Sequence, residues 1–131
     1  MNRRLFFVTL FSFLLMAVLE TAAIVYGLFF YWWWFDIPMH FLGGFFAGSF
    51  SLWVLLTFFK KFQSVRDIFL ATFFGAMLIG AVWELFEYFT GLTFVVYSTY
   101  TFDTVKDFLM DGLGALGAYA VAVVIMREKV S

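Results

Sequence analysis

The sequence predicts an all-α integral membrane protein, folded as a compact bundle of four transmembrane helices. Hydrophobic residues make up 65% of the 131 residues and charged residues 13%, whereas soluble proteins have about 45–50% and about 25%. The mean hydropathy is +0.99. A water-soluble chain of this length could not bury so much apolar surface, because small domains leave a large share of their surface exposed. The lipid bilayer therefore has to cover the remainder.

Four apolar runs are long enough to cross a bilayer, whose hydrocarbon core takes about 20 helical residues. They cover residues 5–30, 37–59, 68–90 and 105–126. The first run is longer than the apolar core of a signal peptide, so we expect it to remain as a helix. Three consecutive tryptophans at 32–34 suit the membrane–water interface, and we expect the segment 91–104 to lie along that interface. The short connections predict a single membrane domain over residues 1–131.

Basic residues predict the orientation of the bundle, since Lys and Arg are enriched in cytoplasmic loops. Seven of the eight flank the helices at one end: Arg3, Arg4, Lys60, Lys61, Arg66, Arg127 and Lys129. We therefore expect both termini and the middle loop to be cytoplasmic, in a multi-pass protein of the cell (inner) membrane.

Acidic residues gather at the opposite, outer end of the predicted bundle. Seven of the nine are in its outer half: Glu20, Asp36, Glu84, Glu87, Asp103, Asp107 and Asp111. A charge at the bilayer centre costs about 2.5–3.5 kcal/mol on insertion scales, so such side chains face the protein interior and have partners. The nearby cationic candidates are Lys106 and His40. Two cationic groups cannot neutralise seven carboxylates. We therefore expect some of the carboxylates to be protonated, bound to a cation, or solvated in a polar cavity that opens to the outer face.

Helical spacing places these polar side chains on faces made of small residues. His40 shares a helix face with Gly44, and Asp111 shares one with Gly114, because residues three and four apart are neighbours on a helix. Small residues let membrane helices approach closely. The polar faces are therefore expected to point into the bundle. Asp36 comes two residues before a proline and is expected to cap its helix.

Five of the polar residues are candidate ligands of a divalent cation. They are Asp36, His40, Glu84, Asp107 and Asp111. Imidazole suits Zn and carboxylates suit Mg, Ca and Mn, so the residue types do not distinguish Zn, Mn, Mg and Ca. Glu84 and Asp107 are also candidates for a catalytic base.

Four further residues are candidates for the wall of the same cavity, and each has a structural alternative. Glu20 could instead be a protonated packing residue, and Glu87 an interfacial residue that reaches water. Asp103 could simply favour the start of its helix through the helix dipole. Lys106 could extend its amine outward or contact an anionic headgroup. The structural alternative for His40 is a packed, hydrogen-bonding imidazole.

Several classes of function are excluded by composition. The absence of Cys excludes disulfides, Cys-ligated zinc, iron–sulfur clusters and thiol catalysis. A net charge of −1 excludes an electrostatic nucleic-acid binder. The glycine-rich segments lie within predicted membrane helices and follow no strand, so they are not nucleotide-binding loops.

Two segments of the chain resemble known membrane families. DIPMHFLGGFFAG (36–48) and DTVKDFLMDGLGALG (103–117) resemble the small VanZ-like membrane proteins. They are more similar to the bacterial inner-membrane family typified by YjdF, which has an acidic motif like WELFEY (83–88). The resemblance covers the second to fourth helices and implies a small inner-membrane protein. For some VanZ-like members it implies glycopeptide-antibiotic tolerance, and such members often have Asn in place of Asp111.

These observations favour a metal-dependent hydrolase or transferase that acts on the headgroup of a phosphate-bearing lipid in the outer leaflet. Membrane lipid is then the expected partner, and a homo-oligomer stays open. An ion or proton transporter that uses the same acids is the first alternative, since acids within the membrane commonly have that role. A non-catalytic subunit whose acids bind a partner is the second.

Overall fold

The computed structural model describes residues 3–59, 64–91 and 99–127. It contains five helices in this part of the chain: α1 (Arg3–Tyr26), α2 (Leu28–Tyr31), α3 (Asp36–Phe58), α4 (Val65–Thr90) and α5 (Tyr100–Arg127). All except the short α2 are long and apolar enough to cross a membrane. The predicted all-α bundle of four membrane helices is confirmed.

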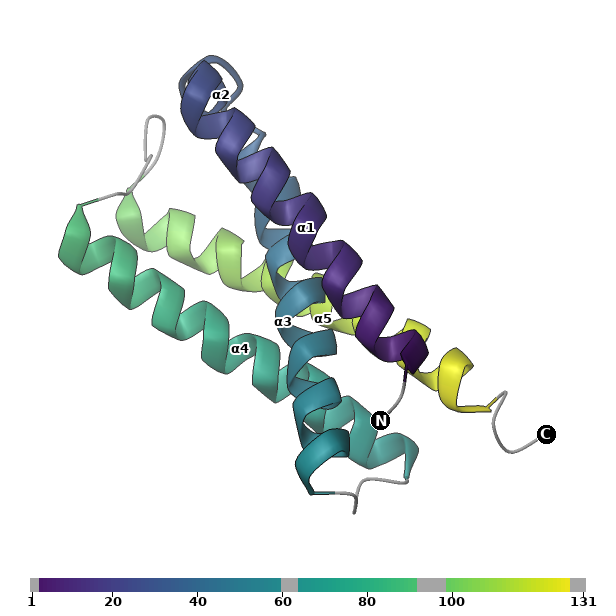
Figure 1. Cartoon of the computed structure of the whole chain (residues 1–131). Coiled ribbons are helices and arrows are strands. Elements are labelled where there is room, and N and C mark those ends of the chain that lie inside the picture. The colour runs from purple at the N-terminus through teal and green to yellow at the C-terminus, as the bar shows by residue number, and fades with distance from the viewer. Residues whose placement is uncertain (1–2, 60–63, 92–98, 128–131) are drawn as a thin grey trace.

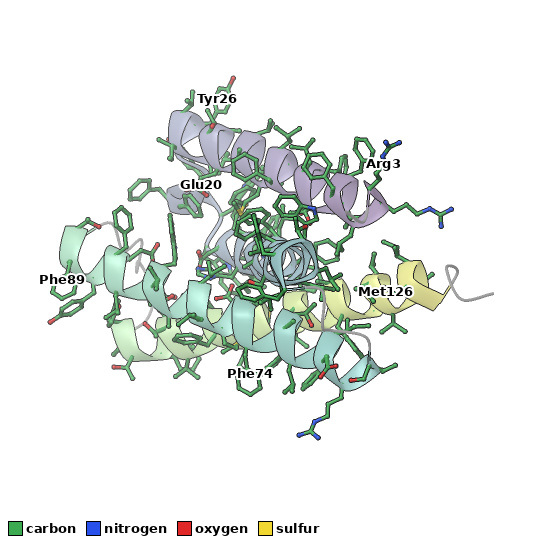
Figure 2. The ribbon with its side chains drawn as sticks, turned by 60° about the horizontal axis from the view of Figure 1, so that its bottom comes forward. Arg3, Glu20, Tyr26, Phe74, Phe89 and Met126 are labelled. Atoms are coloured by element: carbon green, nitrogen blue, oxygen red, sulfur yellow. The ribbon has the colours of Figure 1, made fainter. Side chains whose placement is uncertain are left out.

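Helix α3 lies at the centre of the bundle. It has α1 on one side and the pair α4 and α5 on the other (Figures 1 and 2). Helix α1 packs mainly against α3 and only slightly against α5. The starts of α1 and α4 and the ends of α3 and α5 lie at one end, which we call the basic end (Figure 1). We call the opposite end, where Asp36 and Asp103 lie in the first turns of α3 and α5, the acidic end.

The backbones of α3 and α5 touch where the two helices cross. A Cβ atom on Gly44 would lie 2.5 Å from the Cα of Asp111, and one on Gly114 would lie 2.6 Å from the backbone nitrogen of Phe45. One turn further along, a Cβ on Gly48 would lie 3.4 Å from the Cα of an alanine of α5. Membrane helices pack closely through small residues in this way. The crossing is therefore the element that brings the two polar faces together.

The helix that begins the chain ends earlier than predicted. Tyr26 ends α1 because Gly27 has a left-handed backbone (φ 66°), which glycine adopts without a steric cost. After α2, the side chains of Trp32, Trp33 and Trp34 are exposed, and the first and third stack with ring centroids 5.7 Å apart. Exposed indoles at a helix connection are typical of the membrane–water interface.

Helix starts also differ from the sequence prediction. The expectation that Asp36 caps α3 is wrong: Phe35 is the cap, and Asp36 is the first helical residue, with its carboxylate turned toward α5. Helix α4 begins at Val65 because Ser64 and Asp67 form a capping box. Helix α5 begins at Tyr100, inside the segment that we expected to lie along the interface, and residues 92–98 of that segment lie outside the described residues.

The predicted orientation can be tested with single cysteines, since the chain has none of its own. Tyr31 and Val65 are exposed and lie at the acidic and basic ends. We expect an impermeant maleimide added outside cells to label Tyr31→Cys directly and Val65→Cys only after permeabilisation. The opposite pattern would reverse the orientation. Lys60, Lys61 and Lys129, on which the prediction partly depends, lie outside the described residues.

Candidate metal centre

The imidazole of His40 lies among three aspartates at the crossing of α3 and α5. Its Nε2 is 3.5 Å from Oδ1 of Asp36 and 3.7 Å from Oδ2 of Asp107. Its Nδ1 is 3.4 Å from Oδ1 of Asp111. Asp36 and His40 lie one helical turn apart on α3, and Asp107 and Asp111 lie one turn apart on α5. Each helix therefore presents two adjacent polar side chains to the other. Both ring nitrogens of His40 therefore face carboxylate oxygens.

Lys106 contacts two of these carboxylates, those of Asp36 and Asp107, through the oxygens that face away from His40. Its Nζ lies 2.9 Å from Oδ2 of Asp36 and 3.4 Å from Oδ1 of Asp107. A third carboxylate, that of Asp103, is 2.7 Å away and accepts a hydrogen bond from it. Lys106 was a candidate for the wall of the cavity, with outward extension or a headgroup contact as the alternatives, and the structure pairs its ammonium with three acids. Asp36 and Asp107 thus each present one oxygen to His40 and the other to Lys106.

Helix α4 provides space for Asp111. A Cβ on Gly80 would collide with Oδ2 of Asp111, and one on Gly43 of α3 would lie 3.9 Å from Oδ1. Asp111 is only 5% exposed as a result. The glycine of α4 therefore allows a carboxylate to sit in the interior of the bundle, beside the Nδ1 of His40.

Glu84 of α4 accepts two hydrogen bonds from α5. Its Oε2 accepts a hydrogen bond from the hydroxyl of Thr104 at 2.8 Å, and its backbone oxygen accepts one from the hydroxyl of Tyr100 at 3.1 Å. Its Oε1 is buried and has no hydrogen-bond partner among the described residues. Thr104 and Tyr100 were not predicted as partners of Glu84, because both fall in the segment 91–104 that was predicted to connect two helices. Thr104 precedes Asp107 by three residues, and that spacing was a usable signal.

The remaining candidates lie around this cluster. Glu20 of α1 and Glu87 of α4 are part-buried, and Figure 2 shows Glu20 on the side of α1 that faces the other helices. Neither belongs to the group of described residues whose geometry suits a metal ion. Asp103 is engaged with Lys106. The structure thus brings four of the five predicted ligands together around the imidazole of His40, and Glu84 accepts a hydrogen bond from Thr104.

Three of these residues could together hold a metal ion. Asp36, His40 and Asp107 can each offer one ligand atom, and these atoms all lie within 4.8 Å of one another. Two ligands of a tetrahedral zinc ion, each about 2.0–2.2 Å from the metal, lie about 3.4 Å apart. The separations of 3.5 and 3.7 Å at Nε2 are close to that value. Asp111 would then orient the imidazole through Nδ1, as second carboxylates commonly do for metal-bound histidines.

The fold and the site define a four-span membrane protein with a carboxylate–histidine cluster inside its helix bundle. The chain belongs to the family described as "Predicted membrane protein (DUF2238)", whose model matches residues 2–128. Searches of curated proteins and of solved structures each found no match. The family match confirms a membrane protein family, and the nearer resemblance to VanZ-like proteins and to YjdF stays a prediction.

Proposed function

We propose that the protein binds one divalent metal ion through Asp36, His40 and Asp107 and uses it on a phosphate-bearing group of a membrane lipid. The observation that carries the proposal is the convergence of Oδ1 of Asp36 and Oδ2 of Asp107 on Nε2 of His40. One nitrogen and two oxygen ligands suit Zn²⁺ or Mn²⁺ better than Ca²⁺ or Mg²⁺, which prefer oxygen alone.

The number of ligands favours a reactive site over a structural one. Structural zinc is closed by four protein ligands, whereas catalytic zinc has three and leaves a position for water or substrate. A metal with an open position can polarise a phosphoryl oxygen or activate water. Asp36, Asp103 and Lys106 are part-exposed near the starts of their helices, so a headgroup at the acidic end could approach the metal. Glu84 remains the candidate for a base, because Asp107 is one of the proposed ligands.

Ion or proton passage is less well supported. One turn beyond the polar cluster, toward the basic end, Ala47, Ala76 and Ala115 form a buried apolar layer of α3, α4 and α5. The buried hydroxyls beyond this layer, such as that of Thr72, donate to carbonyl groups of their own helices. Among the described residues the buried carboxylates therefore do not continue toward the basic end.

Metal binding by the purified protein tests the first half of the proposal. We expect chelator-treated protein in detergent to bind about one Zn²⁺ or Mn²⁺ per chain in calorimetric titration. Bound metal should also raise its melting temperature, because a ligand at a hundred times its Kd stabilises the folded state by about 2.7 kcal/mol. Asp67→Asn is the matched control: it removes a carboxylate at the basic end and should bind metal like the natural chain.

Folded protein that binds none of Zn²⁺, Mn²⁺, Mg²⁺ and Ca²⁺ would refute the metal centre. The second half is tested separately, by following phosphate-bearing lipids in vesicles that contain the metal-loaded protein. If every lipid class survives unchanged while metal binds, the protein is a metal-binding protein without this activity.

A further inference from the structure

The ammonium group of Lys106 is paired with the two carboxylates that would bind the proposed metal ion. Its Nζ lies 2.9 Å from Oδ2 of Asp36 and 3.4 Å from Oδ1 of Asp107. These are the oxygens of the two proposed metal ligands that face away from His40. Oδ1 of Asp107 is buried and has no hydrogen-bond partner within residues 3–59, 64–91 and 99–127, so its contact with Lys106 is an ion pair. The ammonium therefore holds Asp36 by a charged hydrogen bond and Asp107 by an ion pair.

A divalent ion bound to the oxygens that face His40, Oδ1 of Asp36 and Oδ2 of Asp107, would repel this ammonium. The two cations would be separated only by the width of a carboxylate group, in a partly buried site where charges are weakly screened. Lys106 has a second anchor, Asp103, on its own helix and 2.7 Å away. The side chains of Asp103 and Lys106 are exposed to about the same degree. The amine can therefore leave Asp36 and Asp107 and still remain paired with Asp103.

We infer that Lys106 is a built-in competitor for the metal: its ammonium neutralises Asp36 and Asp107, and a divalent cation displaces it from both toward Asp103. This inference rests on the proposed function, because it concerns the same two carboxylates. Its consequence is a site that loads and releases metal reversibly, since the empty state keeps a partner for its carboxylates. It also makes an ammonium group available beside the metal once the ion has bound.

Lys106→Gln separates competition from simple orientation of the ligands. If Lys106 competes, the variant should bind Zn²⁺ at least about tenfold more tightly than the natural chain, because a repelling charge has been removed. Lys106→Arg keeps the charge and should stay near the natural affinity. If Lys106 instead orients the carboxylates, Lys106→Gln should bind about 10–100-fold more weakly. An unchanged or weaker affinity would overturn the inference and leave the metal centre intact.

Displacement can be measured directly by the reactivity of the amine. We expect saturating Zn²⁺ to increase the rate at which an amine-acylating reagent modifies Lys106, read by mass spectrometry of the peptide. In His40→Gln, which should not bind metal, Zn²⁺ should leave that rate unchanged. Slower modification on metal binding would overturn the inference. Binding by neither the natural chain nor Lys106→Gln would refute the metal centre itself, and binding by Lys106→Gln alone would show that Lys106 excludes the metal.

Discussion

Gly114→Ala should reduce the free energy of unfolding by about 3 kcal/mol or more, the upper part of the range for overfilling a packed interior. The added Cβ would collide with the backbone oxygen of Phe41 and would lie 2.6 Å from the backbone nitrogen of Phe45. A flexible side chain could rotate away from a new methyl group, but the main chain of a helix cannot. Helices α3 and α5 would have to separate along the whole crossing.

Gly112→Ala is the matched control for this prediction. It is the same substitution two residues earlier in α5, at a buried position where the new Cβ would meet only the ends of two side chains, at 3.6 and 3.9 Å. Because alanine favours a helix over glycine by about 1 kcal/mol, this variant should be as stable as the natural chain or slightly more stable. Unfolding by a denaturing detergent measures the free energy of unfolding of both variants. Equal stability of the two variants would contradict the close backbone contact.

Much of the fold could be predicted because the length of an apolar run and the side on which small residues fall are properties of a single helix. The range of α3 was predicted to within one residue at either end, and the shared face of His40 and Gly44 follows from helical spacing. The break at Gly27 was missed because a glycine inside an apolar run is also compatible with a continuous membrane helix.

The partners of individual side chains were harder to predict. Spacing tells which side of its own helix a residue occupies, but it does not tell which neighbour that side faces, because this depends on how each helix is rotated in the bundle. Spacing therefore did not predict that the Glu84 carboxylate accepts a hydrogen bond from Thr104 of α5. Lys106 has a long, flexible side chain that could reach water, lipid or protein, and only the folded arrangement brings it to Asp36.

His40→Gln should abolish metal binding, with an affinity loss well above the roughly 10–100-fold that follows removal of a supporting carboxylate. His40 is the residue on which the other ligand atoms converge: its Nε2 faces Asp36 and Asp107, and its Nδ1 faces Asp111. Glutamine keeps a polar group of similar reach but has no imidazole nitrogen. Calorimetric titration with Zn²⁺ and Mn²⁺ measures the loss, and melting without metal shows whether the variant remains folded.

A graded series distinguishes a metal centre from an ion-paired histidine. Asp107→Asn removes a proposed ligand and should resemble His40→Gln. Asp111→Asn keeps the shape of a side chain that only supports the imidazole, so it should remain folded and lose about 10–100-fold in affinity. Glu84→Gln should lose less than Asp111→Asn, because Glu84 is not among the three residues that can share one metal ion and its carboxylate already accepts a hydrogen bond from Thr104. If His40→Gln bound metal like the natural chain, the cluster would be a set of ion pairs that brace α3 against α5. If Glu84→Gln lost as much affinity as Asp107→Asn, the metal would lie between α4 and α5, with Glu84 among its ligands.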